Sequence, residues 1–116
     1  MANEPFNIKQ HATAPAWVYD IQDDIDATPS AVDLTTATGV EFRMRITGTT
    51  GAPQVTGTME ITDAANGRVT YDWATGDTAL VGTYDVEHAV TWGDGTVEVF
   101  PNVGYETVIV NDDLSD

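Results

Sequence analysis

Few residues of this chain belong to the types that perform nucleophilic or acid–base catalysis. The sequence has no cysteine, and its histidines and serines are His11, His88, Ser30 and Ser115. A serine nucleophile needs a histidine base and a group that orients this base, and neither serine lies in a motif of that kind. His88 alternates with Val86 and Val90, which predicts a hydrogen-bonded histidine in the core or at an interface. We therefore expect no enzymatic activity and no catalytic residue.

Carboxylates are far more numerous, and one acidic stretch is a candidate cation site. With nineteen Asp and Glu residues, some pair will stand at a glycosidase-like separation whatever the function is. The stretch comprises Asp20, Asp23, Asp24 and Asp26. Ca²⁺ binds about six to eight oxygen atoms, but the stretch lacks the glycine and the terminal Glu of a calcium-binding helix–loop–helix. We interpret it as solvated acidic surface and expect no metal and no cofactor; a calcium-stabilised adhesion or surface-layer domain is the alternative.

The three tryptophans are candidates for stacking against sugar rings, as aromatic residues do on carbohydrate-binding sandwiches. Alternation places Trp73 on the same strand face as Tyr71, and Trp92 on the same face as Val90. Because these faces are apolar, we predict core positions for Trp73 and Trp92. The pattern leaves the position of Trp17 undetermined.

Arg43 and Arg45 are two of only four basic residues, and both project from the polar side of one predicted strand. A cross-strand pair with Glu60 or another acid would account for them within one chain. The alternative is a contact with a neighbouring acidic subunit. On that basis Arg43 and Arg45 are the predicted interface residues.

Strands must position all of these side chains, because apolar and polar residues alternate along most of the sequence. Residues 40–47 show the pattern most clearly, with apolar side chains at even positions. Further strands are predicted at residues 6–9, 17–19, 55–61, 69–73, 84–92, 97–99 and 105–110. Gly57 interrupts one of them, as at a bulge or a close approach of another backbone, and Asn66-Gly67 predicts a tight hairpin turn. About eight strands at intervals of roughly ten residues are typical of a sandwich.

One turn indicates which type of β-sandwich the sequence forms. Asp77 begins a turn that leads into a strand whose first inward residue is Tyr84, as at the tyrosine corner of immunoglobulin-like domains, where the phenol bonds upstream backbone. The sequence therefore predicts an all-β fold, an immunoglobulin-like antiparallel β-sandwich of about eight strands. We expect a single domain over residues 1–116, with flexible arms at residues 1–5 and 111–116.

The charge of the chain excludes several partners. Its net charge is -15 and its pI about 4.1, so it repels nucleic-acid phosphates and anionic lipids, and we expect neither a nucleic acid nor a membrane as partner. No apolar run is long enough to span a bilayer. Asp outnumbers Glu thirteen to six and Lys9 is the only lysine. This acidity is typical of adaptation to high salt, where the repulsion is screened; a high-GC genome is the alternative explanation.

The order of landmarks along the chain resembles the N-terminal domain of phage baseplate upper proteins, an immunoglobulin-like sandwich of tailed-virus structural proteins. The resemblance extends from Phe6 to Leu114. It is found in Phe6-Asn7-Ile8-Lys9, Asp33-Leu34-Thr35, Val40-Glu41-Phe42-Arg43-Met44, Gly67-Arg68-Val69, Tyr71, Trp73, Asp77-Thr78, Gly82, Tyr84, Gly93-Asp94-Gly95, Phe100-Pro101, Gly104-Tyr105 and Val108-Ile109-Val110. These residues build the scaffold, so the resemblance implies a class of protein and no catalytic or binding residue.

The resemblance implies a virion structural protein of a tailed virus that acts by protein–protein assembly. Its place would be the tail, the baseplate, the neck or a capsid decoration. We expect other virion structural proteins as partners and a symmetric homo-oligomer, since virion rings and vertices impose symmetry. Edge strands of a sandwich offer unpaired backbone groups to a neighbour. The alternative is a host-surface or glycan recognition module of the same fold, which requires an exposed tryptophan.

Overall fold

The computed structural model describes residues 5–23 and 30–114, and strands account for most of them. The strands are β1 (Phe6–Lys9), β2 (Trp17–Asp20), β3 (Gln22–Asp23), β4 (Ser30–Ala31), β5 (Ala37–Ile46), β6 (Val55–Asp63), β7 (Arg68–Tyr71), β8 (Gly82–Trp92), β9 (Val97–Phe100) and β10 (Glu106–Asn111). Within these ranges a single 3₁₀ turn, η1 (Ala64–Asn66), is the only helical element. The predicted all-β fold is confirmed.

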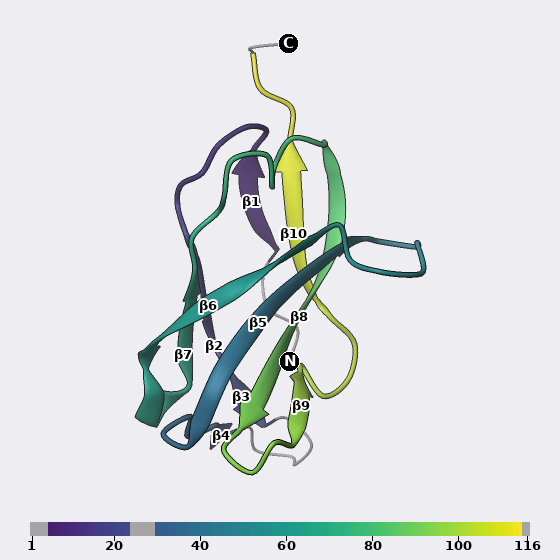
Figure 1. Cartoon of the computed structure of the whole chain (residues 1–116). Helices are drawn as coiled ribbons and strands as arrows, with labels where there is room; N and C mark the ends of the chain where they lie inside the picture. Colours follow the sequence, from purple (N-terminus) through teal and green to yellow (C-terminus); the bar gives the residue numbers. More distant parts are fainter. Residues whose placement is uncertain (1–4, 24–29, 115–116) are drawn as a thin grey trace.

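One eight-stranded sheet folds over on itself to make two layers (Figure 1). Its strand order is β1-β10-β8-β5-β6-β7-β2, and β9 pairs with β8 beyond the end of β10. Strand β6 joins the layers, because its first half pairs with β5 and its second half with β7. The predicted sandwich is therefore nearly closed on the side of β6.

One strand pair differs from the predicted antiparallel arrangement. β1 runs parallel to β10, with Phe6 opposite Val108 and Lys9 opposite Asn111. A short hairpin forces consecutive strands to be antiparallel. The two strands here come from opposite ends of the chain, so no turn sets their relative direction.

Aromatic side chains fill the space between the layers. Phe42 of β5 is fully buried and stacks on Tyr71 of β7, with ring centroids 4.3 Å apart. Trp73 meets Phe42 edge-on at 5.5 Å, and both Trp73 and Trp17 are 5% exposed. The core position predicted for Trp73 is confirmed, and Trp17 joins it. Trp92 is half-buried and packs against the rim of the core.

Two local predictions need correction, and β9 adds a detail that was not predicted from the sequence. The pairing of β5 with β6 continues through Gly57 without a bulge; a Cβ there would lie 2.5 Å from Cε1 of Tyr71, so an aromatic ring, and not a backbone, requires this glycine. The turn at Asn66 is a 3₁₀ turn in which Gly67 alone has a positive φ, of 75°. In β9 the buried residue is Phe100, which places residues 97 and 99 on the outer face.

The tyrosine corner is present. The phenol of Tyr84 is buried and donates a hydrogen bond to the Leu80 carbonyl at 2.6 Å, four residues upstream. This bond fixes the turn that precedes β8, as the sequence predicts.

Contacts extend beyond the predicted end of the ordered domain. β10 continues to Asn111, whose carbonyl accepts from the Gln10 amide at 2.6 Å. Lys9 Nζ donates to the Asp112 carbonyl at 3.3 Å. Residues 1–4 and 115–116 of the predicted arms lie outside the described residues. Among the residues described, no helix is long and apolar enough to cross a membrane.

Candidate functional site

The outer face of β5 and β8 holds the two arginines singled out by the sequence. Even-numbered residues of both strands point into the core, so odd-numbered residues point outward. The antiparallel register places Arg43 opposite Glu87 and Arg45 opposite Asp85. Two basic side chains of one strand therefore stand beside two acidic side chains of the next.

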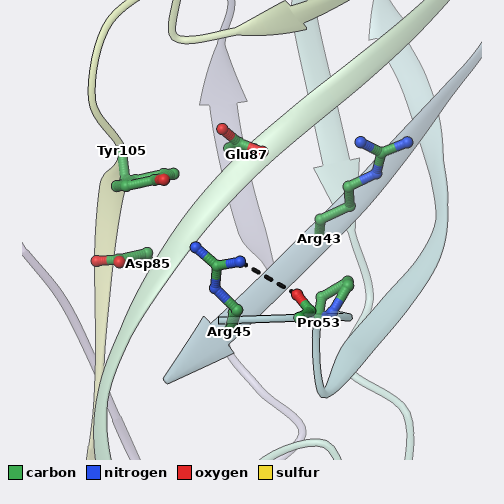
Figure 2. Close-up of a pocket in the computed structure, with 7 residues that line it drawn as sticks. Arg43, Arg45, Pro53, Asp85, Glu87 and Tyr105 are labelled. Carbon is green, nitrogen blue, oxygen red and sulfur yellow. Dashed lines mark hydrogen bonds between the residues drawn. The ribbon is translucent and has the colours of Figure 1, made fainter. Parts of the chain in front are cut away.

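These side chains border a hollow of about 210 Å³ on the surface (Figure 2). Its lining residues are Arg43, Arg45, Gly51, Pro53, Asp85, Glu87 and Tyr105. Figure 2 shows the charged ends of the four side chains standing apart from one another. Tyr105 is 49% exposed and adds an aromatic surface to the rim.

The arginines have partners other than the acids opposite them. Arg43 Nε lies 2.6 Å from Oε1 of Glu41, two residues earlier on the same strand. Arg45 donates from a terminal nitrogen to the Gly51 carbonyl at 3.1 Å, the contact drawn in Figure 2. The alternative of a pair with Glu60 is wrong, because Glu60 lies opposite Thr70 in the other half of β6.

Hydrogen-bonding capacity in the hollow is only partly used. Arg45 Nε is buried and has no hydrogen-bond partner within residues 5–23 and 30–114. A buried donor without an acceptor costs about 1–3 kcal/mol, and an incoming carboxylate would meet the terminal nitrogens of Arg45, of which one already donates to the Gly51 carbonyl. Asp85 accepts from the Thr47 hydroxyl at 2.8 Å, which leaves its second oxygen for another donor. The arrangement can bind a carboxylate and a cationic side chain side by side.

His88, the other candidate for chemistry, lies in the core as the sequence predicts. It is fully buried, and its ring stacks on Tyr19 with centroids 4.1 Å apart. Trp17 Nε1 donates to Nε2 of His88 at 2.9 Å, and Nδ1 lies 3.2 Å from the Phe100 carbonyl. We therefore assign the proton to Nδ1 of a neutral ring. Burial lowers the pKa of His88 to about 4, against the smaller opposing effect of the Phe100 carbonyl.

The remaining candidates are dispersed. His11 is exposed at the turn after β1, and Ser30 is exposed in β4. Ser115 lies outside the described residues, as do Asp24 and Asp26 of the acidic stretch. The part of the chain that the structure describes holds no group of three or more His, Asp or Glu residues that could bind a metal ion.

Asp20, the first residue of the acidic stretch, has a partner within the chain. Its carboxylate accepts two hydrogen bonds from Arg68, at 2.8 and 3.2 Å. These bonds lower the pKa of Asp20. Because the carboxylate is engaged in an ion pair, Asp20 is less available as a cation ligand.

The third tryptophan lies at the rim. The indole nitrogen of Trp92 donates to Glu98 at 2.8 Å, and its side chain borders a shallow hollow with Thr36 and Asp94. Of the three tryptophans, Trp92 is the one whose ring reaches the surface. The sequence predicted a core position for Trp92, and the structure places it at the end of β8, partly buried against the core.

No protein-family model matches this chain, and no curated protein matches it in sequence.

Proposed function

We propose that this chain is a structural component of a tailed-virus particle, in the tail, the baseplate or a capsid decoration, and that it acts by protein–protein assembly. The order of landmarks that resembles baseplate upper proteins supports this role. Those landmarks lie on a two-layered sandwich with the Tyr84 corner. The proposal rests chiefly on the outer face of β5 and β8, where charged side chains stand in register without pairing across the strands.

The strand edges offer a second means of assembly. β1 and β2 are the two ends of the strand order, so each has one edge that no other strand covers within the described sheet. Unpaired backbone groups on such edges can bind a strand of a neighbouring subunit. A small sandwich with a filled core and uncovered strand edges thus supports a role as a rigid subunit of a larger assembly.

A glycan recognition module would have to use Trp92. Trp17 and Trp73 are 5% exposed and give their indole N–H groups to His88 and to the Pro15 carbonyl. A ring buried to that extent presents no face to a sugar. Acrylamide quenching that reaches one tryptophan, together with its protection by an added glycan, would favour the recognition module.

Mass spectrometry of purified particles tests the proposed role. The virus that encodes this chain would be grown, and its particles purified through two successive density gradients. We expect the chain at a fixed ratio to the major capsid protein in every preparation. If infected cells contain the chain and the purified particles do not, the proposed function is wrong.

A further inference from the structure

We infer that the outer face of β5 and β8 is a self-complementary interface for a second copy of this chain, related by a two-fold axis parallel to these strands. This inference deepens the proposed function, because it assigns a partner and a geometry to the assembly contact. It follows from the arrangement of charge, from the unused hydrogen-bonding groups and from the size of the face.

The arrangement of charge selects the partner. Arg43 and Arg45 lie on β5, and the strand register places Glu87 and Asp85 of β8 opposite them. A second copy carries a net charge of -15 and only four basic residues. Most ways of bringing two such surfaces together therefore place carboxylates against carboxylates. This face holds half of the basic residues, so it can meet its own copy with opposite charges in contact.

The same pattern selects the axis. Consider a two-fold axis that runs parallel to the strands, above the outer face and midway between β5 and β8. It places β5 of one copy over β8 of the other, and each residue keeps its position along the strand direction. Arg43 then faces Glu87 of the second copy, and Arg45 faces its Asp85. An axis perpendicular to the strands would place β5 over β5 and the arginines against each other. The parallel axis also agrees with the aligned packing of sheets, whose strands cross at about 30°.

The groups on this face are available for such contacts. In the described part of the chain, no ion pair joins Arg43 to Glu87 or Arg45 to Asp85. Glu87 has no hydrogen-bond partner among those residues, and Arg45 uses one terminal nitrogen for the Gly51 carbonyl. Arg43 contacts Glu41 through Nε and Asp85 contacts Thr47 through one oxygen, so each keeps further donor or acceptor atoms for a partner from another chain.

The size and composition of the face suit a dimer. A second hollow, of about 450 Å³, adjoins the first at Arg43 and includes Ala89 and Val97. Val97 is 55% exposed and Tyr105 49%, so apolar surface flanks the charges. β5 and β8 have 10 and 11 residues, and they are flanked by the first half of β6 on one side and by β10 and the shorter β9 on the other. At about 4.8 Å between strands and about 3.3 Å per residue this face measures roughly 20 by 30 Å. This extent is close to the roughly 800 Å² that each partner contributes to a stable interface.

Charge exchange across the face tests the inference. The first variant carries Arg43→Glu with Arg45→Glu, so the four charged positions are all acidic. The second carries Asp85→Lys with Glu87→Lys, so they are all basic. Analytical ultracentrifugation should show wild-type dimers and, for each variant alone, a dissociation constant raised about tenfold or more. The two variants mixed in equal amounts should form a heterodimer, because each strand then faces opposite charge.

A control variant and a milder pair keep the test decisive. Lys9→Glu replaces a basic residue by an acidic one, as the first variant does, but on β1, outside the proposed interface. It should leave the dissociation constant of the dimer unchanged. Arg43→Glu and Glu87→Lys as single substitutions repeat the mixing experiment without disturbing the Asp85 bond to Thr47. Circular dichroism confirms that each variant is folded.

Three outcomes would overturn the inference: a monomeric wild type at about 200 μM, variants that dimerise like the wild type, or folded variants that remain separate when mixed. The readout is independent of the particle experiment. A monomer found in purified particles would refute only this interface. A dimer absent from them would refute only the proposed function.

Discussion

The two faces of β5 and β8 place the same strands in opposite environments. On the inner face, Phe42 and His88 are fully buried, and each polar atom of the His88 ring has a partner within the chain. On the outer face, Arg45 Nε and Glu87 have no hydrogen-bond partner within the described residues, and Asp85 accepts from Thr47 but pairs with neither arginine. The inner face is thus complete in one chain. For the outer face, we propose that a partner completes these contacts.

This difference separates stability from association along one strand. A change at an even position of β5 removes contacts that hold the two layers together. A change at an odd position alters what the surface can bind and leaves the core in place. Substitutions at neighbouring positions should therefore have effects of different size and kind.

The largest expected effect is that of Phe42→Ala. Phe42 contacts the rings of Tyr71, Trp73 and Trp17 across the core, and truncation of a buried Phe costs about 3–5 kcal/mol. The neighbouring Arg43→Ala should change the free energy of unfolding by about 0.5 kcal/mol or less. Urea unfolding followed by tryptophan fluorescence, at low protein concentration, measures both. Equal losses would contradict the separation of the two faces.

Acid should weaken the inner face through His88. Its pKa is lowered from 6.5 to about 4 in the folded chain, so between these values the unfolded chain binds more protons. The free energy of unfolding should therefore fall as the pH falls from about 6.5 to about 4, by about 3 kcal/mol in total. Above pH 6.5 this group contributes no pH dependence.

Carboxylates titrate over part of the same range, so the His88 contribution is obtained by difference. Urea unfolding at a series of pH values should show a smaller loss for His88→Gln than for the wild type. Identical pH profiles for the wild type and His88→Gln would refute the assignment.

An intermediate effect is expected at Gly57. A Cβ there would lie 2.5 Å from the Tyr71 ring, which stacks on Phe42 and donates to Asp77 at 2.5 Å. Gly57→Ala should therefore displace the ring and cost about 1–3 kcal/mol. Gly39→Ala is the matched control, because nothing lies within 4 Å of the added atom. Thermal unfolding compares the two, and a neutral Gly57→Ala would show that the ring moves freely.

The smallest effect concerns the tyrosine corner. Tyr84→Phe removes the hydrogen bond to the Leu80 carbonyl and should cost about 1 kcal/mol. Tyr105→Phe removes a hydroxyl from a side chain that is 49% exposed on the outer face and should be neutral. Chemical denaturation of both variants measures the difference. A Tyr84→Phe variant as stable as the wild type would mean that the corner is held by packing alone.

Much of the fold follows from local alternation. The period of two along residues 40–47 and 84–92 determines which side chains face inward, whatever lies opposite them. The turn before Tyr84 is also local, since the phenol bonds a carbonyl four residues upstream. For the site, the same alternation placed Arg43 and Arg45 on the outer face. It did not identify their partners, because the contacts with Glu41 and Gly51 depend on the side-chain conformations of the arginines and on the conformation of the loop after β5.

Sequence alone thus determined the longer strands, most of their inward residues and the acidic surface, because each depends on neighbouring residues or on composition. Only the tertiary structure decided that Trp17 bonds His88, 71 residues away, and that Gly57 makes room for Tyr71. It also decided that the two arginines stand beside Asp85 and Glu87. These contacts depend on strand register and on the meeting of two layers, which a local pattern does not specify.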